Sequence, residues 1–260
     1  MSAISLERVT VTLGGREVVR EVTAEIETGH WVALIGPNGA GKTSLLRAVA
    51  GLLPCDGSVS LEGAPLAELG RRERAQRLAL VPQEPRTPPW LTVAEYVLMG
   101  RTPYLRPLAR EGDADHDAAA RALSRLDLDE LAERTLGTLS GGERQALTLL
   151  MATWLRPEIL LLDEHTAALD PKSGDKVIRV SEDIIARDKL TVLMVTHSMS
   201  QAATLGDRLI MMHRGRIIYD VRGAEKRRLR PADLLVRFEE LRRGEQLDET
   251  AADMLRRVYV

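Results

Sequence analysis

The sequence predicts an α/β fold whose core is a largely parallel sheet, with an antiparallel β entry subdomain and an inserted helical subdomain. Three observations carry this prediction. The runs 159–162 and 192–195 are short and continuously apolar, as in strands buried on both faces of a parallel sheet. Residues 6–26 alternate apolar and polar near period two, which is typical of antiparallel strands. Residues 88–157 show helical patterns and little strand signal.

Composition limits the function before any motif is considered. The chain has 260 residues, of which 44% are hydrophobic and 28% charged, which excludes disorder as the main state. Its 36 basic and 38 acidic residues give a net charge of −2, and aromatic residues make up 3%. We therefore expect no nucleic-acid partner. One cysteine, and no apolar run near the ~20 residues that span a bilayer, indicate a cytoplasmic chain.

The elements follow in order along the chain. Two strands joined at Gly14-Gly15 form the entry hairpin, and the apolar run 31–35 leads through glycines into a helix over 43–50. Further strands are predicted at 78–81, 159–162 and 192–195, a helix at 118–126, and a β-hairpin at 209–219. Leu234, Leu235, Phe238 and Leu241 recur at helical spacing near the end. We expect a core at 1–87 and 158–222, a helical subdomain at 88–157 and a helical extension at 223–260.

The segment Gly36–Thr43, GPNGAGKT, fits the phosphate-binding loop pattern between a buried strand and a helix. Glycines allow consecutive N–H groups to surround phosphates, Lys42 reaches the outer phosphates, and Thr43 offers its hydroxyl to magnesium. This predicts a P-loop NTPase core of the RecA-like type. The alternative is a glycine-rich turn with an incidental lysine, and the flanking elements disfavour it.

A second motif, Ile159–Glu164, is an apolar strand that ends in two carboxylates. Adjacent buried acids are unfavourable unless cations or hydrogen bonds receive them. Beside a phosphate loop, we interpret Asp163 as holding magnesium through water and Glu164 as the general base for the attacking water. The alternative is a strand end that emerges into solvent.

The stretch Leu139–Gln145, LSGGERQ, places Ser140 as the N-cap of an apolar helix and leaves two glycines at the helix start. Composition alone indicates a capped helix. The stretch matches the signature sequence of ATP-binding cassette (ABC) transporters, and from about residue 3 to 222 the chain resembles their nucleotide-binding subunit. All principal motifs of that family occur in order.

The resemblance implies a head-to-tail homodimer that holds ATP and Mg²⁺ between the phosphate loop of one subunit and the signature of the other. Gln83 would sense magnesium and water and link to the membrane partner, and His197 would contact the γ-phosphate and position the water. The resemblance implies catalytic roles for Glu164, His197 and Gln83, and metal roles for Thr43, Gln83 and Asp163. The implied nucleotide-binding residues are Gly36, Pro37, Asn38, Gly39, Ala40, Gly41, Lys42, Thr43, Ser44, Ser140, Gly141, Gly142 and Asp170.

Two positions depart from the family's pattern. Leu13 stands where many members have an aromatic residue that stacks on adenine, which puts base stacking in doubt. His165 stands where the family usually has proline after the catalytic glutamate. His165 either supports the turn or tunes Glu164 through a hydrogen bond, and the residues alone leave both interpretations open.

The type of transporter is predicted from two regions. Residues 82–105 resemble the ATPases of importers for iron chelates, haem and cobalamin, whereas 145–172 resemble an importer group for small, amino-acid-like solutes. We therefore expect a mosaic, natural or constructed, with its seam near the signature. The expected function is ATP hydrolysis that energises solute import through a separate permease, with a solute-binding protein as an indirect partner, at the inner face of the cell membrane. The alternatives are a soluble ABC ATPase that acts as a scaffold, and a hybrid with little activity.

Overall fold

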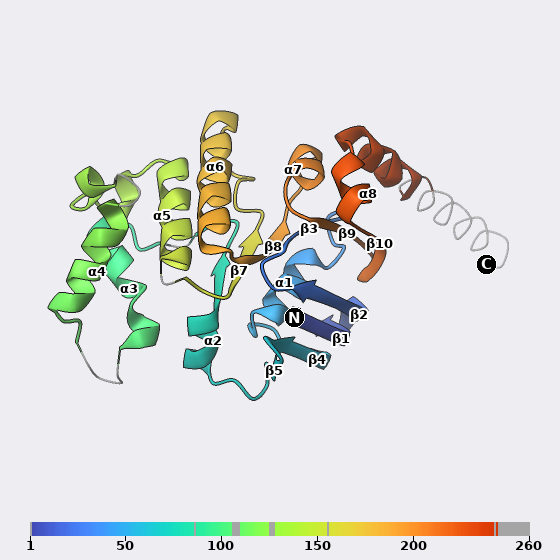
Figure 1. Cartoon of the computed structure of the whole chain (residues 1–260), viewed down its shortest axis with the longest axis horizontal. Coiled ribbons are helices and arrows are strands. Elements are labelled where there is room, and N and C mark those ends of the chain that lie inside the picture. Colours follow the sequence, from blue (N-terminus) through green and yellow to red (C-terminus); the bar gives the residue numbers. More distant parts are fainter. Residues whose placement is uncertain are drawn as a thin grey trace, which may run out of the picture.

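The computed structural model describes residues 2–85, 87–105, 110–124, 128–154, 156–241 and 243. It is an α/β fold with two sheets, and the strands and helices spread along one long axis (Figure 1). Helices α3 to α5 lie at one end of this axis and α8 lies toward the other, with the strands β1, β2 and β4 between them. Among the described residues, no helix is both long enough and apolar enough to cross a membrane.

The first sheet is antiparallel and confirms the predicted entry hairpin. Its four strands pair in the order β2-β1-β4-β5. Their bounds are Ser2–Leu13 (β1), Arg16–Glu27 (β2), Asp56–Leu61 (β4) and Ala64–Pro65 (β5). In β1 and β2, alternate side chains such as Val9, Val22 and Ile26 are buried, because one face of this sheet covers the core.

The second sheet has the order β10-β9-β3-β8-β7-β6, with parallel pairing throughout except between β9 and β10. Its strands are Trp31–Ile35 (β3), Leu78–Val81 (β6), Ile159–Asp163 (β7), Thr191–Val195 (β8), Arg208–His213 (β9) and Arg216–Arg222 (β10). Every residue of β3, β7 and β8 is buried, as their continuous apolar runs predict. Strand β6 differs: three of its four residues are half-buried, because it forms an edge of the sheet.

Helices connect these strands and cover both faces of the sheet. They are α1 (Lys42–Val49), α2 (Arg71–Arg77), α3 (Val93–Met99), η1 (Thr102–Tyr104), α4 (Asp113–Ser124), η2 (Asp129–Leu131), η3 (Leu136–Thr138), α5 (Gly141–Thr153), α6 (Pro171–Asp188), α7 (Met199–Thr204) and α8 (Gly223–Arg228). Residues 231–241 are helical as well. Residues 125–126 of the helix predicted at 118–126, and residues 244–260 of the predicted extension, lie outside the described residues.

The core sits on both faces of the second sheet. On one face, Leu45, Leu46 and Val49 of α1 pack into a cluster shared by both sheets. On the other face, Leu149 of α5 and Ile184 of α6 pack against β7 and β8. Full burial of each such side chain contributes about 1.5–3 kcal/mol, so these helices are held firmly on the sheet. The carboxyl ends of the parallel strands are thereby fixed relative to one another.

The two helical regions have apolar clusters of their own. Helices α3, α4 and α5 share a cluster that includes Val97, Leu123 and Leu147. In the C-terminal region, Leu234 is fully buried against β9 and α7, and Phe238 packs at the edge of that cluster. Leu235, which the helical pattern grouped with them, is 51% exposed, because it lies off the buried face of its helix.

Candidate active site

The phosphate loop connects β3 to α1, and two of its glycines are required by space as well as by backbone angle. Gly36 has φ 153°, and a Cβ there would lie 2.2 Å from the carbonyl oxygen of Met212. Gly41 has φ 95°, and a Cβ there would lie 2.3 Å from the carbonyl oxygen of Val18. Among the residues that the structure describes, no side chain caps the start of α1. The loop is therefore a tight backbone cradle at an uncapped helix start, which is the arrangement that favours phosphate.

Lys42, the first residue of α1, is 5% exposed and folds back over this loop. Its Nζ donates to the carbonyl oxygens of Gly36 (2.9 Å) and Pro37 (3.1 Å). Burial lowers the pKa of the Lys42 ammonium, and the charges of Glu164 and Asp163 oppose that shift. Both hydrogen bonds go to neutral carbonyls, so a phosphate oxygen could replace a carbonyl as the partner of this buried ammonium.

The two carboxylates at the end of β7 have different surroundings. Asp163 is 4% exposed and accepts a hydrogen bond from the Thr43 hydroxyl at 2.9 Å. Burial raises the pKa of the Asp163 carboxyl, and the Thr43 hydrogen bond lowers it. A cation beside these two oxygens would stabilise the ionised carboxylate, so the pair is a chemically suitable place for Mg²⁺.

Glu164 follows Asp163 in the left-handed backbone region, with φ 49°. That conformation costs a non-glycine residue roughly 1–2 kcal/mol, and the structure compensates locally. The Glu164 N–H donates to the carbonyl oxygen of Val195 at 3.0 Å, and its Oε1 lies 2.5 Å from Nε2 of His197. The backbone turn thus aims the Glu164 carboxylate at the histidine that follows the neighbouring strand.

These groups converge on one cleft of about 430 Å³. Its lining residues are Val18, Asn38, Gly39, Ala40, Gly41, Lys42, Thr43, Ser44, Gln83, Glu164 and His197. The sequence pattern singled out all of them except Val18, which comes from β2 and carries no chemical signal. Gly36 and Pro37 do not line the cleft, and their carbonyls accept hydrogen bonds from Lys42. Asp163 does not line it either, and it contacts the cleft through its hydrogen bond with Thr43. The cleft combines a phosphate cradle, a buried cation and a histidine-paired carboxylate.

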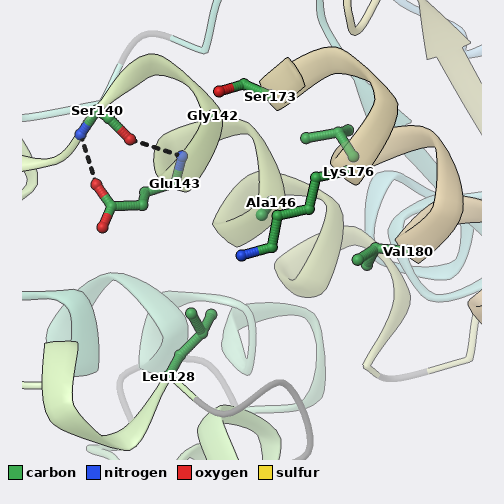
Figure 2. A pocket seen from close by; sticks show the side chains of 9 residues that line it. Leu128, Ser140, Gly142, Glu143, Ala146, Ser173, Lys176 and Val180 are labelled. Atoms are coloured by element: carbon green, nitrogen blue, oxygen red, sulfur yellow. Dashed lines mark hydrogen bonds between the residues drawn. The ribbon is translucent and has the colours of Figure 1, made fainter.

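The signature residues lie elsewhere, at the start of α5. Ser140 caps this helix: its hydroxyl accepts from the Glu143 N–H (3.2 Å), and the Glu143 carboxylate accepts from the Ser140 N–H (2.7 Å). Figure 2 shows these two hydrogen bonds beside a pocket of about 480 Å³ between α5 and α6. Ser140 and Gly142 line this pocket rather than the cleft of the phosphate loop. One chain therefore does not bring its own signature and phosphate loop together in one cavity.

Asp170 and Gly141 also lie near this second pocket. Asp170 is the N-cap of α6, and its carboxylate accepts from the Ser173 N–H at 3.1 Å. A Cβ on Gly141 would lie 3.4 Å from a methyl group of Leu169, and one on Gly142 would lie 3.0 Å from Cβ of Ser173. The signature glycines thus permit close packing of α5 against the start of α6.

The structure shows what surrounds His165 and Leu13, the two residues that depart from the family's pattern. His165 is 2% exposed, and its Nε2 lies 3.3 Å from the Ser181 hydroxyl on α6. Burial lowers the pKa of His165 to about 4, so its imidazole is neutral. Its hydrogen bond goes to α6 and not to Glu164, which favours support of the turn. Leu13 is 41% exposed and lines a recess of about 490 Å³ beside Gly39.

A sequence profile of the ABC transporter family matches residues 19–167. The chain belongs to this family. A tyrosine transport ATP-binding protein of Clostridioides difficile is 36% identical over 85% of the chain and 91% of that protein. A hemin import ATP-binding protein of Nocardia farcinica is 39% identical over 85% of the chain and 75% of that protein.

Solved structures of ABC transporter cassettes have the same fold as this chain. A dimeric bacterial ABC transporter cassette superposes with a TM-score of 0.74 at 28% identity, over 84% of the chain and 98% of the cassette. The chain is accordingly an ATP-binding ABC ATPase with the predicted α/β cassette fold. The tyrosine and hemin relatives cover equal shares of the chain, so these matches do not locate a seam. The predicted mosaic stays a prediction.

Proposed function

We propose that this ABC ATPase hydrolyses ATP to ADP and phosphate in order to drive solute import through a separate membrane permease. The convergence of the phosphate cradle, Thr43 and the Glu164–His197 pair on one cleft carries this proposal, with Asp163 hydrogen-bonded to Thr43 behind the cleft lining. The relative named for hemin import supports the direction of transport, and the relative named for tyrosine transport supports a transport role.

The residues present fit ATP and Mg²⁺. A Cβ at Gly36 or at Gly41 would collide with a carbonyl oxygen of β9 or β2, so only glycine allows the loop to follow this path. Such a glycine loop leaves its backbone N–H groups to face phosphates. Lys42 binds the outer phosphates, and the Thr43 hydroxyl, Asp163 and Gln83 hold the metal. When bound, Mg²⁺ neutralises charge on the phosphate oxygens. Glu164 takes the proton of the attacking water, and His197, 2.5 Å from Glu164, positions that carboxylate and contacts the γ-phosphate.

The second half of the site comes from a partner copy. Ser140, Gly141, Gly142 and Asp170 are separated from the cleft within one chain, and dimers are seen in solved cassettes of the family. We infer a head-to-tail homodimer in which each signature helix completes the cleft of the other subunit. The Ser140 hydroxyl accepts one hydrogen bond in its cap and keeps its proton for donation to a phosphate oxygen.

The permease contact is proposed for the segment after Gln83. Trp90 is 74% exposed and Met99 is 49% exposed, both in the region whose pattern resembles importers of iron chelates, haem and cobalamin. Tryptophan and methionine are enriched in protein–protein interfaces relative to the rest of the surface. We propose that the subunit binds peripherally at the inner face of the membrane, against a permease of the iron-chelate or cobalamin type, and that a solute-binding protein acts indirectly.

The first experiment measures phosphate release from ATP with Mg²⁺. Glu164→Gln should lower kcat by at least about 100-fold, because general base catalysis typically contributes about 10²–10⁴. The same variant should retain ATP and accumulate as a dimer in size-exclusion chromatography. A parental rate in Glu164→Gln would contradict the role of Glu164, and an inactive parent chain would favour the hybrid interpretation.

The second experiment separates a transporter subunit from a soluble scaffold. The parent chain should co-purify with a multi-spanning permease from detergent-solubilised membranes. Trp90→Ser should lower that recovery while the phosphate release of the isolated subunit stays at the parental rate. Full ATPase activity with no membrane partner would favour the scaffold.

A further inference from the structure

The geometry points to Gln201 as a positioning residue for the catalytic pair, joining the segment that carries His197 to the segment that carries Glu164. This inference rests on the proposed hydrolysis at that pair. Gln201 lies in α7, immediately after the segment that carries His197. It lies outside the lining of the cleft, so it acts through other residues.

The Gln201 side-chain amide accepts one hydrogen bond and donates another. Its Oε1 accepts from the Thr196 hydroxyl at 2.8 Å, and its Nε2 donates to the Thr166 hydroxyl at 3.3 Å. Thr196 directly precedes His197 and is 5% exposed, and Thr166 is two residues after Glu164. A single amide therefore spans the two chain segments whose side chains meet in the catalytic pair.

The groups around the Gln201 amide also hydrogen-bond to one another. The Ser198 N–H donates to the Thr196 hydroxyl at 3.1 Å, so that hydroxyl both donates and accepts. The Ser198 hydroxyl caps α7 by accepting from the Gln201 N–H at 3.2 Å. Gln201 is thereby fixed at both its backbone and its side chain, and its amide has a defined orientation toward Thr196 and Thr166.

Residues outside the Glu164–His197 pair are needed to hold its two side chains in place. Glu164 has a positive φ, and its carboxylate lies in the cleft beside a histidine whose side chain is 43% exposed. An exposed histidine at the start of a loop has several rotamers available, and proton abstraction requires a fixed position of the acceptor oxygen. The Thr196–Gln201–Thr166 bridge, defined by these three residues, adds a side-chain link between the two loops beyond the backbone hydrogen bond from Glu164 to Val195.

The test compares shape-matched variants by steady-state kinetics. Gln201→Met removes both hydrogen bonds while keeping the length of the side chain, and Thr166→Val removes one hydroxyl while keeping the shape. Each should lower kcat by about 10-fold, with the KM for ATP within about twofold of the parent, because chemistry and not nucleotide binding loses its alignment. Thr166→Ser keeps the hydroxyl and should restore kcat to within about twofold.

Two further measurements separate positioning from general damage to the fold. Thr204→Val, on the same helix, removes a hydrogen bond to Ser200 that does not reach the bridge, and its kcat should be parental. The double variant Gln201→Met/Thr166→Val should be no slower than the slower single variant, because both changes break one bridge.

A parental kcat in Gln201→Met would overturn the inference, as would a loss confined to KM, or losses that multiply in the double variant. An inactive parent chain would instead overturn the proposed function itself. Loss of hydrolysis in Glu164→Gln together with a parental rate in Gln201→Met would retain the proposed function and refute only the bridge.

Discussion

The cleft of the phosphate loop and the pocket at the start of α5 are both built from glycines that lead into a helix, yet their helix starts differ. The start of α1 has Gly41 as its N-cap and no side-chain cap, whereas the start of α5 is closed by the reciprocal cap of Ser140 and Glu143. One helix start is thus free to bind phosphate with its backbone, and the other presents a serine hydroxyl. Similar glycine patterns thus produce helix starts with different hydrogen-bonding groups, as the proposed composite site requires.

The largest effect is expected in the phosphate loop. Gly36→Ala places a Cβ 2.2 Å from the Met212 carbonyl oxygen, so the loop must move and ATP binding should become undetectable. Gly39→Ala is the matched control: its Cβ meets nothing within 4 Å, and only its φ of 79° adds strain. Binding of a fluorescent ATP analogue measures both variants. Equal loss in the two variants would show that space is not the deciding factor.

Complementation between inactive variants tests whether the two regions work across subunits. Lys42→Ala disables the cleft, and Gly142→Asp places a carboxylate at the signature, so each variant alone should be inactive. In a head-to-tail dimer the mixed pair keeps one intact composite site, so mixing should restore up to about a quarter of the parental hydrolysis.

The control for this mixture combines Lys42→Ala with Glu164→Gln, which impair the same cleft. In their mixed dimer both sites still carry one lesion, so no activity should return. Recovery in that control, or its absence in the first mixture, would contradict a site completed by the partner.

The sequence predicts the cleft well because its parts have strong local signals. The continuous runs at 31–35, 159–162 and 192–195 are strands of the second sheet, and the glycine loop lies between β3 and α1 as its pattern requires. The pairing of Glu164 with His197 depends on β7 and β8 being neighbours. Strand order arises from packing of distant segments, which no local pattern encodes.

Some elements and contacts have no local sequence pattern that predicts them. Helix α2 has no buried residue, so it shows no apolar periodicity, and β4 begins with exposed polar residues and a glycine. The partner of His165 is Ser181, sixteen residues away on α6, and a hydrogen bond across that separation is set by how α6 packs. For the same reason, the contact of Gln201 with Thr166 follows from tertiary structure alone.

The next largest effect is expected for His165, which directly follows Glu164 and hydrogen-bonds to α6. Its folded pKa of about 4 lies below the usual 6.5, so the unfolded chain binds more protons between these values. The stability that the neutral imidazole contributes is present above about pH 6.5 and is lost as the pH falls toward 4. Between about pH 7 and pH 4.5 the parent should lose about 2–3 kcal/mol of unfolding free energy more than His165→Gln.

Urea unfolding at the two pH values measures this difference. His165→Gln is the informative variant because an amide can still hydrogen-bond Ser181 but does not titrate. Identical pH dependence in the parent and the variant would contradict a buried neutral histidine at this position.

The smallest change in stability is expected when a helix cap is removed. Ser140→Ala and Thr92→Ala each remove the hydroxyl of a capping box, at α5 and at α3 respectively, and each should cost about 1 kcal/mol. Thermal unfolding should therefore not distinguish them. Phosphate release should, because only the Ser140 hydroxyl is proposed to reach the partner's nucleotide: Ser140→Ala should lose most of its activity, and Thr92→Ala should keep the parental rate. Equal rates in the two variants would mean that Ser140 acts on its own helix alone.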